Sequence, residues 1–253
     1  MFPFMPLRQG RGASSFWRTA LSSALDALLP PLCLLCGAPC AADDTTLCGA
    51  CRRDLPTLPA LHCPDCLAET PRGERCGACL AHPAHFDRAF ALYRYDFPLN
   101  RLVQDLKYHA RFALARRWGE QLARASAEFA ADCIVPLPLH PKRLKERGYN
   151  QALEIARHCA RARHLPLEAT SLTKCRATPP QSGLSLKARQ KNLKGAFCCA
   201  RDFSGQRILL IDDVLTTGTT ANEAARVLKL HDAASVAIAI VARTLRRQDG
   251  ARN

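Results

Sequence analysis

Apolar residues along the chain occur either in short continuous runs or at helical spacing. The continuous runs predict buried strands at residues 89–95, 133–139, 195–199, 207–214 and 234–241. Helical spacing predicts helices at residues 16–29, 100–108, 112–129, 152–162 and 220–230. Because strands and helices alternate, the pattern predicts an α/β fold with a parallel sheet flanked by helices on both faces.

Three polar stretches interrupt this pattern. Residues 141–151 (PKRLKERGYNQ) are predicted to form a basic loop. Residues 174–194 are polar and basic and contain Pro179 and Pro180, which predicts a long mobile loop. Residues 1–15 are predicted to be a disordered extension.

The helix predicted at residues 16–29 raises the question of a membrane segment. Its polar face carries Arg18 and Asp26 rather than a row of basic residues, which favours a packing helix over a membrane-surface helix. No run approaches the ~20 apolar residues of a membrane span, and the first residues lack the apolar stretch of a secretion signal. The chain is therefore expected to be cytoplasmic, with reduced thiols.

Nine of the 14 cysteines lie between Cys33 and Cys79, and eight of these form four C-x-x-C pairs. Two such pairs can give four thiolates to one tetrahedral zinc ion, and a closed site of this kind is structural. A thioredoxin-type dithiol would instead be a single motif inside a βαβ unit. The predicted metal ligands are Cys33, Cys36, Cys48, Cys51, Cys63, Cys66, Cys76 and Cys79.

Some features of the cysteines stay open at this stage. The pairs can combine in sequence or interleave, and Cys40 is a spare that can replace Cys33 or Cys36. The remaining cysteines are expected to be core or surface thiols, namely Cys133, Cys159, Cys175, Cys198 and Cys199.

The formal net charge of +14 is unevenly distributed along the chain. Residues 101–201 hold 20 Lys or Arg against 7 Asp or Glu, so nearly all of the excess lies in that block. A basic field suits a polyanionic partner, either a nucleic acid or a phosphorylated small molecule. A solvated basic surface explains the charge equally well.

The segment ILLIDDVLTTGTT, residues 208–220, places two adjacent carboxylates at the end of an apolar strand. In a parallel sheet such an end opens into the crevice where ligands bind. Asp212 and Asp213 suit ribose hydroxyls and Mg²⁺. The turn after them, with Thr219 or Thr220 as N-cap of the next helix and Gly218 permitting close approach, suits a phosphate group. The segment therefore predicts a site for a ribose 5-phosphate group.

Other interpretations of this segment are weaker. A Walker A loop requires G-K-[ST], which is absent. A receiver domain also has paired acids at a strand end, but it does not need a threonine-rich turn. The remaining alternative is a capped helix after a strand whose two acids are only solvated.

The segment resembles the PRPP-binding motif of type I phosphoribosyltransferases, a hydrophobic run followed by two acids and T-T-G-x-T. Over residues 20–243 the order of motifs is similar to that of the ComF family, competence-related proteins that include ComFC and GntX. These motifs are the cysteine module, LVQDLKYHARFALA, VPLPLHPKRLKERGYNQA, QSGLSLKARQKNLKGAF and IDDVLTTGTT. The resemblance implies a type I phosphoribosyltransferase-like parallel sheet flanked by helices, with a small N-terminal zinc-ribbon module.

The domain organisation predicted from these features has five parts. They are a disordered extension (1–15), an N-terminal helix (16–31), a double zinc ribbon (32–82), a phosphoribosyltransferase-like domain (86–246) and a tail (247–253).

The resemblance also implies roles for individual residues. Asp212 and Asp213 would contact the ribose hydroxyls of PRPP, and its 5′-phosphate would lie against Thr216, Thr217, Gly218, Thr219 and Thr220. In this fold the loop after the first sheet strand binds pyrophosphate, which corresponds to residues 141–151 with the cations Lys142, Arg143, Lys145 and Arg147. A hood that closes over the reacting centre and excludes water would contain Gln181, Leu184, Arg189 and Asn192. The expected catalytic residues are Arg147, Gln181, Arg189, Asp212 and Asp213.

Two functions remain open on the sequence. One is a phosphoribosyltransferase, a pentosyl glycosyltransferase that binds PRPP with Mg²⁺ and transfers 5-phosphoribosyl to an unidentified acceptor, beside two structural zinc ions. The other is a non-catalytic adaptor that holds single-stranded DNA on its basic block, with stacking on Tyr93, Tyr95, Tyr108 and Phe112. Resemblance alone implies a link to DNA uptake, a competence helicase or uptake-machinery protein as partner, and peripheral placement at the inner membrane.

Overall fold

The computed structural model describes residues 30–41, 44–176 and 193–245 of the chain, which divides into two compact units, residues 1–53 and 54–253. In the smaller unit, a bridge between Leu32 and Pro39 and the short helix α2 (Gly49–Arg53) accompany the first two C-x-x-C pairs. The division falls inside the ribbon predicted at 32–82, and the predicted domain boundaries stay a prediction. The extension and helix predicted before residue 30 lie outside the described residues.

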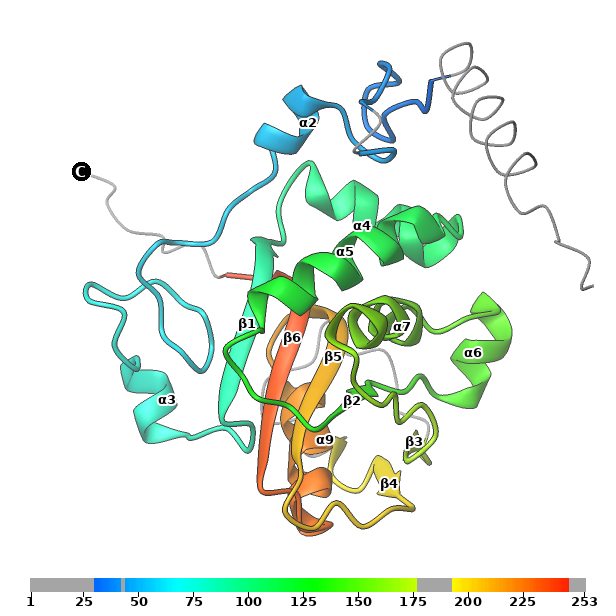
Figure 1. Cartoon of the computed structure of the whole chain (residues 1–253). Helices are drawn as coiled ribbons and strands as arrows, with labels where there is room; N and C mark the ends of the chain where they lie inside the picture. The colour runs from blue at the N-terminus through cyan, green and yellow to red at the C-terminus, as the bar shows by residue number, and fades with distance from the viewer. Residues whose placement is uncertain (1–29, 42–43, 177–192, 246–253) are drawn as a thin grey trace, which may run out of the picture. The chain divides into compact units, whose positions relative to one another are not determined.

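A four-stranded parallel sheet forms the centre of the larger unit, in the order β1-β6-β5-β2 (Figure 1). Its central strands are buried along most of their length, because their apolar runs leave no polar face to expose. The parallel sheet predicted from the hydrophobic pattern is thereby confirmed. The strands are β1 (Arg88–Arg94), β2 (Cys133–Pro136), β5 (Arg207–Leu215) and β6 (Ser235–Arg243).

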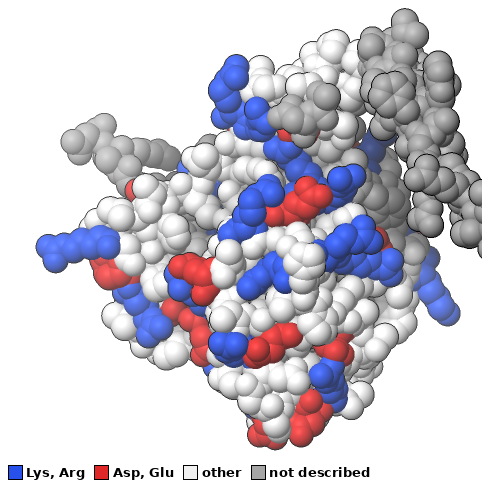
Figure 2. Space-filling view, viewed as in Figure 1, with Lys and Arg blue, Asp and Glu red and all other residues white. Residues whose placement is uncertain are grey.

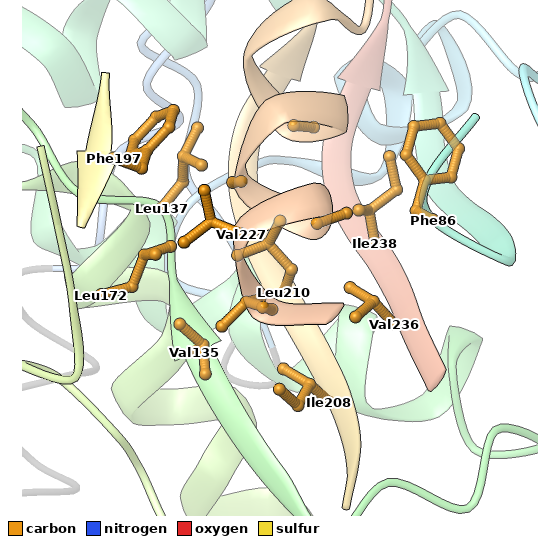
Figure 3. Close-up of a cluster of buried hydrophobic side chains, with 14 of the residues drawn as sticks. Phe86, Val135, Leu137, Leu172, Phe197, Ile208, Leu210, Val227, Val236 and Ile238 are labelled. Carbon is orange, nitrogen blue, oxygen red and sulfur yellow. The ribbon is translucent and has the colours of Figure 1, made fainter. Parts of the chain in front are cut away.

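Helices cover both faces of this sheet. α5 (Phe112–Ala125) and α7 (Gln151–Arg163) pack against each other over one face, preceded by α4 (Leu99–Tyr108) (Figure 1). α9 (Thr219–Leu230) covers the other face, and Figure 3 shows Val135, Leu210 and Ile238 among the strand side chains beneath it. None of the described helices is long and apolar enough to cross a membrane. The second cysteine region carries one more short helix, α3 (Gly77–Ala81).

The basic segment after β2 begins with a helix, so the loop predicted for all of residues 141–151 was wrong. α6 (Pro141–Arg147) has proline at its first position, where an N–H has no helical partner to lose. His140 is its N-cap, and the Lys142 N–H donates to His140 Nδ1 at 3.2 Å. Gly148, with φ of 84°, ends the helix in the left-handed region that favours glycine.

Two short strands outside the main sheet pair with each other. β3 (Leu172–Lys174) and β4 (Phe197–Cys199) are antiparallel, and β4 lies within the strand predicted at 195–199. A disulfide joins Cys175 to Cys198 across this pair. The expectation that these two cysteines are thiols was therefore wrong, whereas Cys133, Cys159 and Cys199 are free thiols.

Gly119 lets α5 and α7 approach closely. A Cβ at this position would lie 2.6 Å from both the Ile155 carbonyl oxygen and the His158 Cβ. We expect Gly119→Ala to push the two helices apart and to lower the free energy of unfolding by about 1–3 kcal/mol, as measured by urea denaturation. Gly77→Ala is the control, because a Cβ there meets no atom within 4 Å. An unchanged unfolding free energy in Gly119→Ala would contradict this packing.

Candidate functional site

The paired acids lie near the carboxyl end of β5. Both remain within the strand, and Asp212 pairs in register with Ile240 of β6. Successive side chains of a strand leave it on opposite faces, yet the two carboxylates are close enough for Asp213 to act on the pKa of Asp212 through its charge and a side-chain hydrogen bond. Asp212 Oδ1 accepts a hydrogen bond from the Asp213 N–H at 2.8 Å, and Asp213 Oδ1 accepts one from the Val214 N–H at 2.7 Å. The backbone thus fixes both half-buried carboxylates.

Lys107 brings a positive charge from the end of α4 to this strand. Its Nζ lies 2.8 Å from Asp213 Oδ2, and the two side chains are only 22% and 13% exposed. Burial lowers the pKa of Lys107, but attraction by Asp213 outweighs burial and raises the pKa above its ordinary value. Lys107 therefore stays charged and neutralises Asp213.

Asp212 differs from its neighbour because no described cation lies within hydrogen-bond distance of its carboxylate. Burial raises the pKa of Asp212 well above its usual range, and the Asp213 carboxylate raises it further. Two cations act on Asp212 through their charge. Lys107 lowers the pKa of Asp212. Burial and the charge of Arg143 lower the pKa of Lys174 on β3, while Asp212 acts in the opposite direction. Because the pKa stays raised despite Lys107 and the Asp213 N–H, the Asp212 carboxylate is only partly compensated, and a further cation or hydrogen-bond donor would stabilise its charged form.

The threonine turn joins β5 to α9. Thr216 and Thr217 are exposed, and the hydroxyl oxygens of Thr217 and Thr219 lie 2.8 Å apart. Gly218, with φ of 77°, is the N-cap of α9, so the prediction of Thr219 or Thr220 as the cap was wrong. Both threonines instead lie in the first turn of the helix. No described side chain caps this N-terminus, which leaves its N–H groups for an anion.

The basic segment starts at the same edge of the sheet. The Leu137 N–H donates to the Ile211 carbonyl at 2.8 Å, just before the acids. Asn150 Nδ2 donates to the Leu137 carbonyl at 3.0 Å, which holds the end of this segment against its beginning. Asn150, the N-cap of α7, is therefore fixed at the sheet edge that carries Asp212.

The predicted cations of this segment differ in their surroundings. Lys142 and Arg143 are exposed, whereas the Arg147 guanidinium lies 5.1 Å from the ring centre of Tyr108, the residue after Lys107. Arg143 is also near enough to affect the pKa of Lys174. The predicted hood lies outside the described residues, including its four named members Gln181, Leu184, Arg189 and Asn192.

The eight predicted metal ligands form two quartets that combine in sequence, which settles the question of interleaving. The first is Cys33, Cys36, Cys48 and Cys51, the second Cys63, Cys66, Cys76 and Cys79, and the sulfurs of each lie within 4.8 Å of one another. The Sγ atoms of Cys36 and Cys48 are 3.7 Å apart, and those of Cys66 and Cys76 are 3.6 Å apart. Zinc–sulfur bonds of about 2.3 Å in a tetrahedron place sulfurs about 3.8 Å apart. Both quartets therefore fit structural zinc, and Cys40 is a buried thiol outside them.

The protonation of the thiols shows why each quartet needs a cation. Burial opposes ionisation of Cys33, but the N–H groups of Cys48 and Cys36 lower its pKa to about 6. In the same quartet, the side-chain hydrogen bond with Cys36, aided by burial, raises the pKa of Cys51 above its ordinary value. Four neighbouring sulfurs cannot all ionise without a positive partner, and zinc supplies it.

The basic excess is only partly visible as a surface of one sign. On the face shown in Figure 2, Lys and Arg side chains are interspersed with Asp and Glu. Ion pairs elsewhere in the described residues also reduce the free positive charge, such as Arg88 with Glu128 and Arg116 with Glu120. Over the described part of this face, charge alone therefore does not define a binding surface.

Three cations of the site were not predicted from the sequence: Lys107 and Lys174 near the acids, and Arg243 at the threonine turn. Lys107 follows the apolar face of a predicted helix, where a lysine is usually solvated, and it meets Asp213 only through the fold. Arg243 lies beyond the predicted end of the last strand and donates to the backbone of Thr216. The sequence indicated these cations only indirectly, because two adjacent acids at a strand end require positive partners.

Comparison with known proteins supports two domains. A family model described as a double zinc ribbon domain matches residues 24–80, and one described as a phosphoribosyl transferase domain matches residues 162–252. Among solved structures, the glutamine PRPP amidotransferase from B. subtilis complexed with ADP and GMP is 21% identical, with a TM-score of 0.39. That match covers 55% of this chain and 30% of the other chain.

Curated relatives match over most of their length. The DNA utilization protein YhgH of Escherichia coli (strain K12) is 33% identical over 225 residues, which are 86% of this chain and 99% of that protein. Competence protein F of Haemophilus influenzae is 31% identical over 194 residues, 72% of this chain and 84% of that protein. The chain therefore belongs to the ComF family, together with DNA utilization protein YhgH and competence protein F.

Proposed function

We propose that this protein binds PRPP with Mg²⁺ and transfers the 5-phosphoribosyl group to an acceptor. The observation that carries the proposal is the placement of the acid pair and the threonine turn, separated by only Val214 and Leu215, at one edge of the parallel sheet. Carboxylates accept hydrogen bonds from sugar hydroxyls, and uncapped helical N–H groups bind phosphate. The match to a phosphoribosyl transferase domain supports the same ligand class.

The proposed contacts follow the chemistry of PRPP from one end to the other. Asp212 and Asp213 accept hydrogen bonds from the ribose hydroxyls, and the turn from Thr216 to Thr220 binds the 5′-phosphate. The pyrophosphate lies toward the cations of the α6 segment, and Mg²⁺ neutralises part of its charge. The assigned cations are Lys142, Arg143 and Arg147, with Gln181 and Arg189 in the hood.

The reaction would be a displacement at C1 of the ribose. The bond from C1 to the pyrophosphate oxygen breaks, that oxygen keeps the electron pair, and the acceptor forms the new bond to C1. Positive charge develops on the ribose ring, where Asp212 and Asp213 stabilise it, while cations stabilise the departing pyrophosphate. The protein then contributes positioning and charge rather than a nucleophile of its own.

Calorimetric titration with PRPP and Mg²⁺ tests the proposal. We expect wild type to bind and the double variant Asp212→Asn/Asp213→Asn to give no binding heat. Asp132→Asn/Asp202→Asn is the matched control, because it removes the same charge from the segments that lead into β2 and β5, toward the opposite end of the sheet. The proposal fails if wild type does not bind or if the site variant binds as well as the control. Pyrophosphate release upon addition of acceptor candidates then distinguishes transfer from binding.

A second function, binding of single-stranded DNA, is favoured by aromatic side chains beside the site. Tyr108 and Phe112 are 68% and 44% exposed, and the Phe112 ring packs edge-on against Tyr149 with centres 4.9 Å apart. Tyr93 and Tyr95 are half-buried and less suited to stacking. Exposed aromatic rings beside cations are typical of single-strand binding surfaces.

The names of the relatives, DNA utilization protein and competence protein, support a link of this second function to DNA handling. A salt series of oligonucleotide binding, followed by fluorescence anisotropy, tests it, and absent or salt-independent binding would exclude it. Location in the cytoplasm or at the inner membrane, and a helicase or uptake protein as partner, stay predictions.

A further inference from the structure

Arg243, the last residue of β6, connects the second cysteine quartet with the turn that opens α9. Its Nε donates to the carbonyl oxygen of Cys66, a member of that quartet, at 2.7 Å. Its Nη1 donates to the carbonyl oxygen of Leu215 at 2.9 Å and to that of Thr216. One rigid guanidinium therefore joins a metal-ligand residue to the backbone where β5 ends and the threonine turn begins.

These hydrogen bonds fix two consecutive peptide planes of the turn. A trans peptide is planar, and its C=O and N–H point to opposite sides. The Leu215 carbonyl shares its plane with the Thr216 N–H, and the Thr216 carbonyl shares its plane with the Thr217 N–H. Because Arg243 draws both carbonyls to its own side, both N–H groups are directed away from the guanidinium. The Thr244 N–H also donates to the Leu215 carbonyl at 3.0 Å, so Arg243 acts together with the end of β6 to set how the turn presents its first two N–H groups.

The other end of this link is attached to the core of the larger unit. The knuckle that contains Cys66 is joined to β1, since the Ala89 N–H donates to the Pro64 carbonyl at 3.1 Å. Leu67 follows Cys66 with φ of 62°, a conformation that is unfavourable for a branched side chain, yet it is 1% exposed. Burial of the Leu67 side chain therefore holds the knuckle against the sheet despite the unfavourable backbone.

The bonding of Arg243 differs from that of an ordinary surface arginine. Within the described residues it forms no ion pair, and its three hydrogen bonds go to main-chain carbonyls from two distant parts of the sequence. An arginine that only balanced charge would pair with a carboxylate. Such an arrangement instead fixes the position of one backbone segment relative to the other.

We propose that Arg243 is a positioning residue through which metal binding at the second quartet orders the phosphate-binding turn. The identity of the ligand rests on the proposed function, whereas the link itself is a property of the ligand-free protein. Metal coordination by Cys63 and Cys66 keeps the Cys66 carbonyl within reach of Arg243. Without the metal, the knuckle loses this crosslink, and Arg243 holds the turn without a fixed support.

Backbone ¹⁵N relaxation of the zinc-loaded full chain tests the link without any ligand. We expect Arg243→Met to lower the order parameters of the Thr216 and Thr217 amides from about 0.85 to below about 0.6, on the picosecond-to-nanosecond timescale. Arg163→Met is the matched control, because Arg163 also donates to two main-chain carbonyls, of Ser126 and Phe129, in another part of the unit. Unchanged order parameters in a folded, zinc-loaded Arg243→Met protein would overturn the proposal.

Metal removal at each quartet provides the second arm. Cys76→Ser, in the second quartet, should mobilise the same two amides, whereas Cys51→Ser, in the first quartet, should not. If Arg243→Met fails to fold, Arg243→Lys replaces it, since lysine keeps the charge but cannot bridge both segments with a planar fork. If Cys76→Ser fails to fold, Cys79→Ser in the same quartet replaces it. Equal effects of Cys76→Ser and Cys51→Ser would also overturn the proposal.

Titration with PRPP and Mg²⁺ connects the link to binding. We expect Arg243→Met to raise the Kd by about tenfold, as for the loss of a charged hydrogen-bond partner, and Arg163→Met to leave it unchanged. If wild type does not bind PRPP but the Thr216 and Thr217 amides still respond, the proposed function fails and the link stands. If wild type binds and Arg243→Met binds equally well, the link fails and the proposed function stands.

Discussion

Asp212→Asn is expected to stabilise the ligand-free protein while weakening PRPP–Mg²⁺ binding by roughly 100-fold, the effect of losing charged hydrogen bonds to two hydroxyls. Burial and the neighbouring Asp213 raise the pKa of Asp212 well above its ordinary value. Asparagine keeps the oxygen that accepts the Asp213 N–H but carries no charge. At pH 7 the free energy of unfolding of Asp212→Asn should exceed that of wild type by about 1.4 kcal/mol for each unit by which folding raises the pKa of Asp212, counted up to a pKa of about 7. Each kcal/mol corresponds to an increase of roughly 2–4 °C in Tm.

The dependence on pH gives this prediction a second readout. A carboxyl whose pKa is raised by folding binds its proton more tightly in the folded protein. Stability then falls as pH rises from the unfolded value, about 4, through the raised folded value. Wild type should show this fall in Tm, and Asp212→Asn should lack the contribution of this group. Thermal unfolding followed at a series of pH values from 4 upward measures the difference.

Asp132→Asn is a control with the opposite sign. Hydrogen bonds from the side chain and the N–H of Arg207 lower the pKa of Asp132 to about 2. That stabilisation is present above the unfolded pKa and is lost only as pH falls toward 2, so its removal should lower Tm at pH 7. If Asp212→Asn lowers Tm in the same way, the Asp212 carboxylate is already well compensated and is not held ready for a ligand.

The sequence predicted those parts of the fold whose signals are local. The apolar run before Asp212 reveals a buried strand because neither face of it meets water, and the strand predicted at 207–214 nearly matches β5. The C-x-x-C spacing reveals the quartets because two sulfurs of a short knuckle can reach one ion. The acids and the threonine turn come together from a single stretch of sequence, so their proximity needed no knowledge of the rest of the chain.

The parts that escaped prediction depend on residues far apart in sequence or on overlooked capping signals. No local pattern indicates that Lys107 meets Asp213, or that Arg243 spans the second quartet and the turn, because the sheet order creates both contacts. The α6 helix did carry local signals, a proline at its first position and Gly148 after its end, but its basic composition resembled a loop. Gly218, rather than Thr219 or Thr220, is the N-cap of α9 because the backbone at this position is left-handed, which favours glycine.

Lys107→Met is expected to lower the free energy of unfolding by about 3–5 kcal/mol, the usual cost of leaving one partner of a buried ion pair without the other. The pair is 2.8 Å long and both side chains are less than one quarter exposed, so water screens the remaining charge poorly. Asp213→Asn in the same background should recover most of the loss. A double-mutant cycle by urea denaturation should therefore give a coupling energy of about 3 kcal/mol or more. A coupling near zero would show that solvent, not Lys107, compensates Asp213.

The response to added Mg²⁺ shows whether the Lys107–Asp213 ion pair only stabilises the fold or also occupies a carboxylate that can bind a metal cation. In Lys107→Met, Asp213 and Asp212 face each other's charge with no ammonium group between the strand end and α4. Added Mg²⁺ should then raise the Tm of Lys107→Met more than that of wild type, because binding to the folded state alone stabilises it. Lys107→Met/Asp213→Asn is the control for this change in Tm, since that variant lacks one of the two carboxylates. Its Tm in samples free of calcium and magnesium is the baseline. Equal Mg²⁺ responses in wild type and Lys107→Met would mean that the acids do not attract the cation, and the role of Lys107 would then be confined to stabilising the fold.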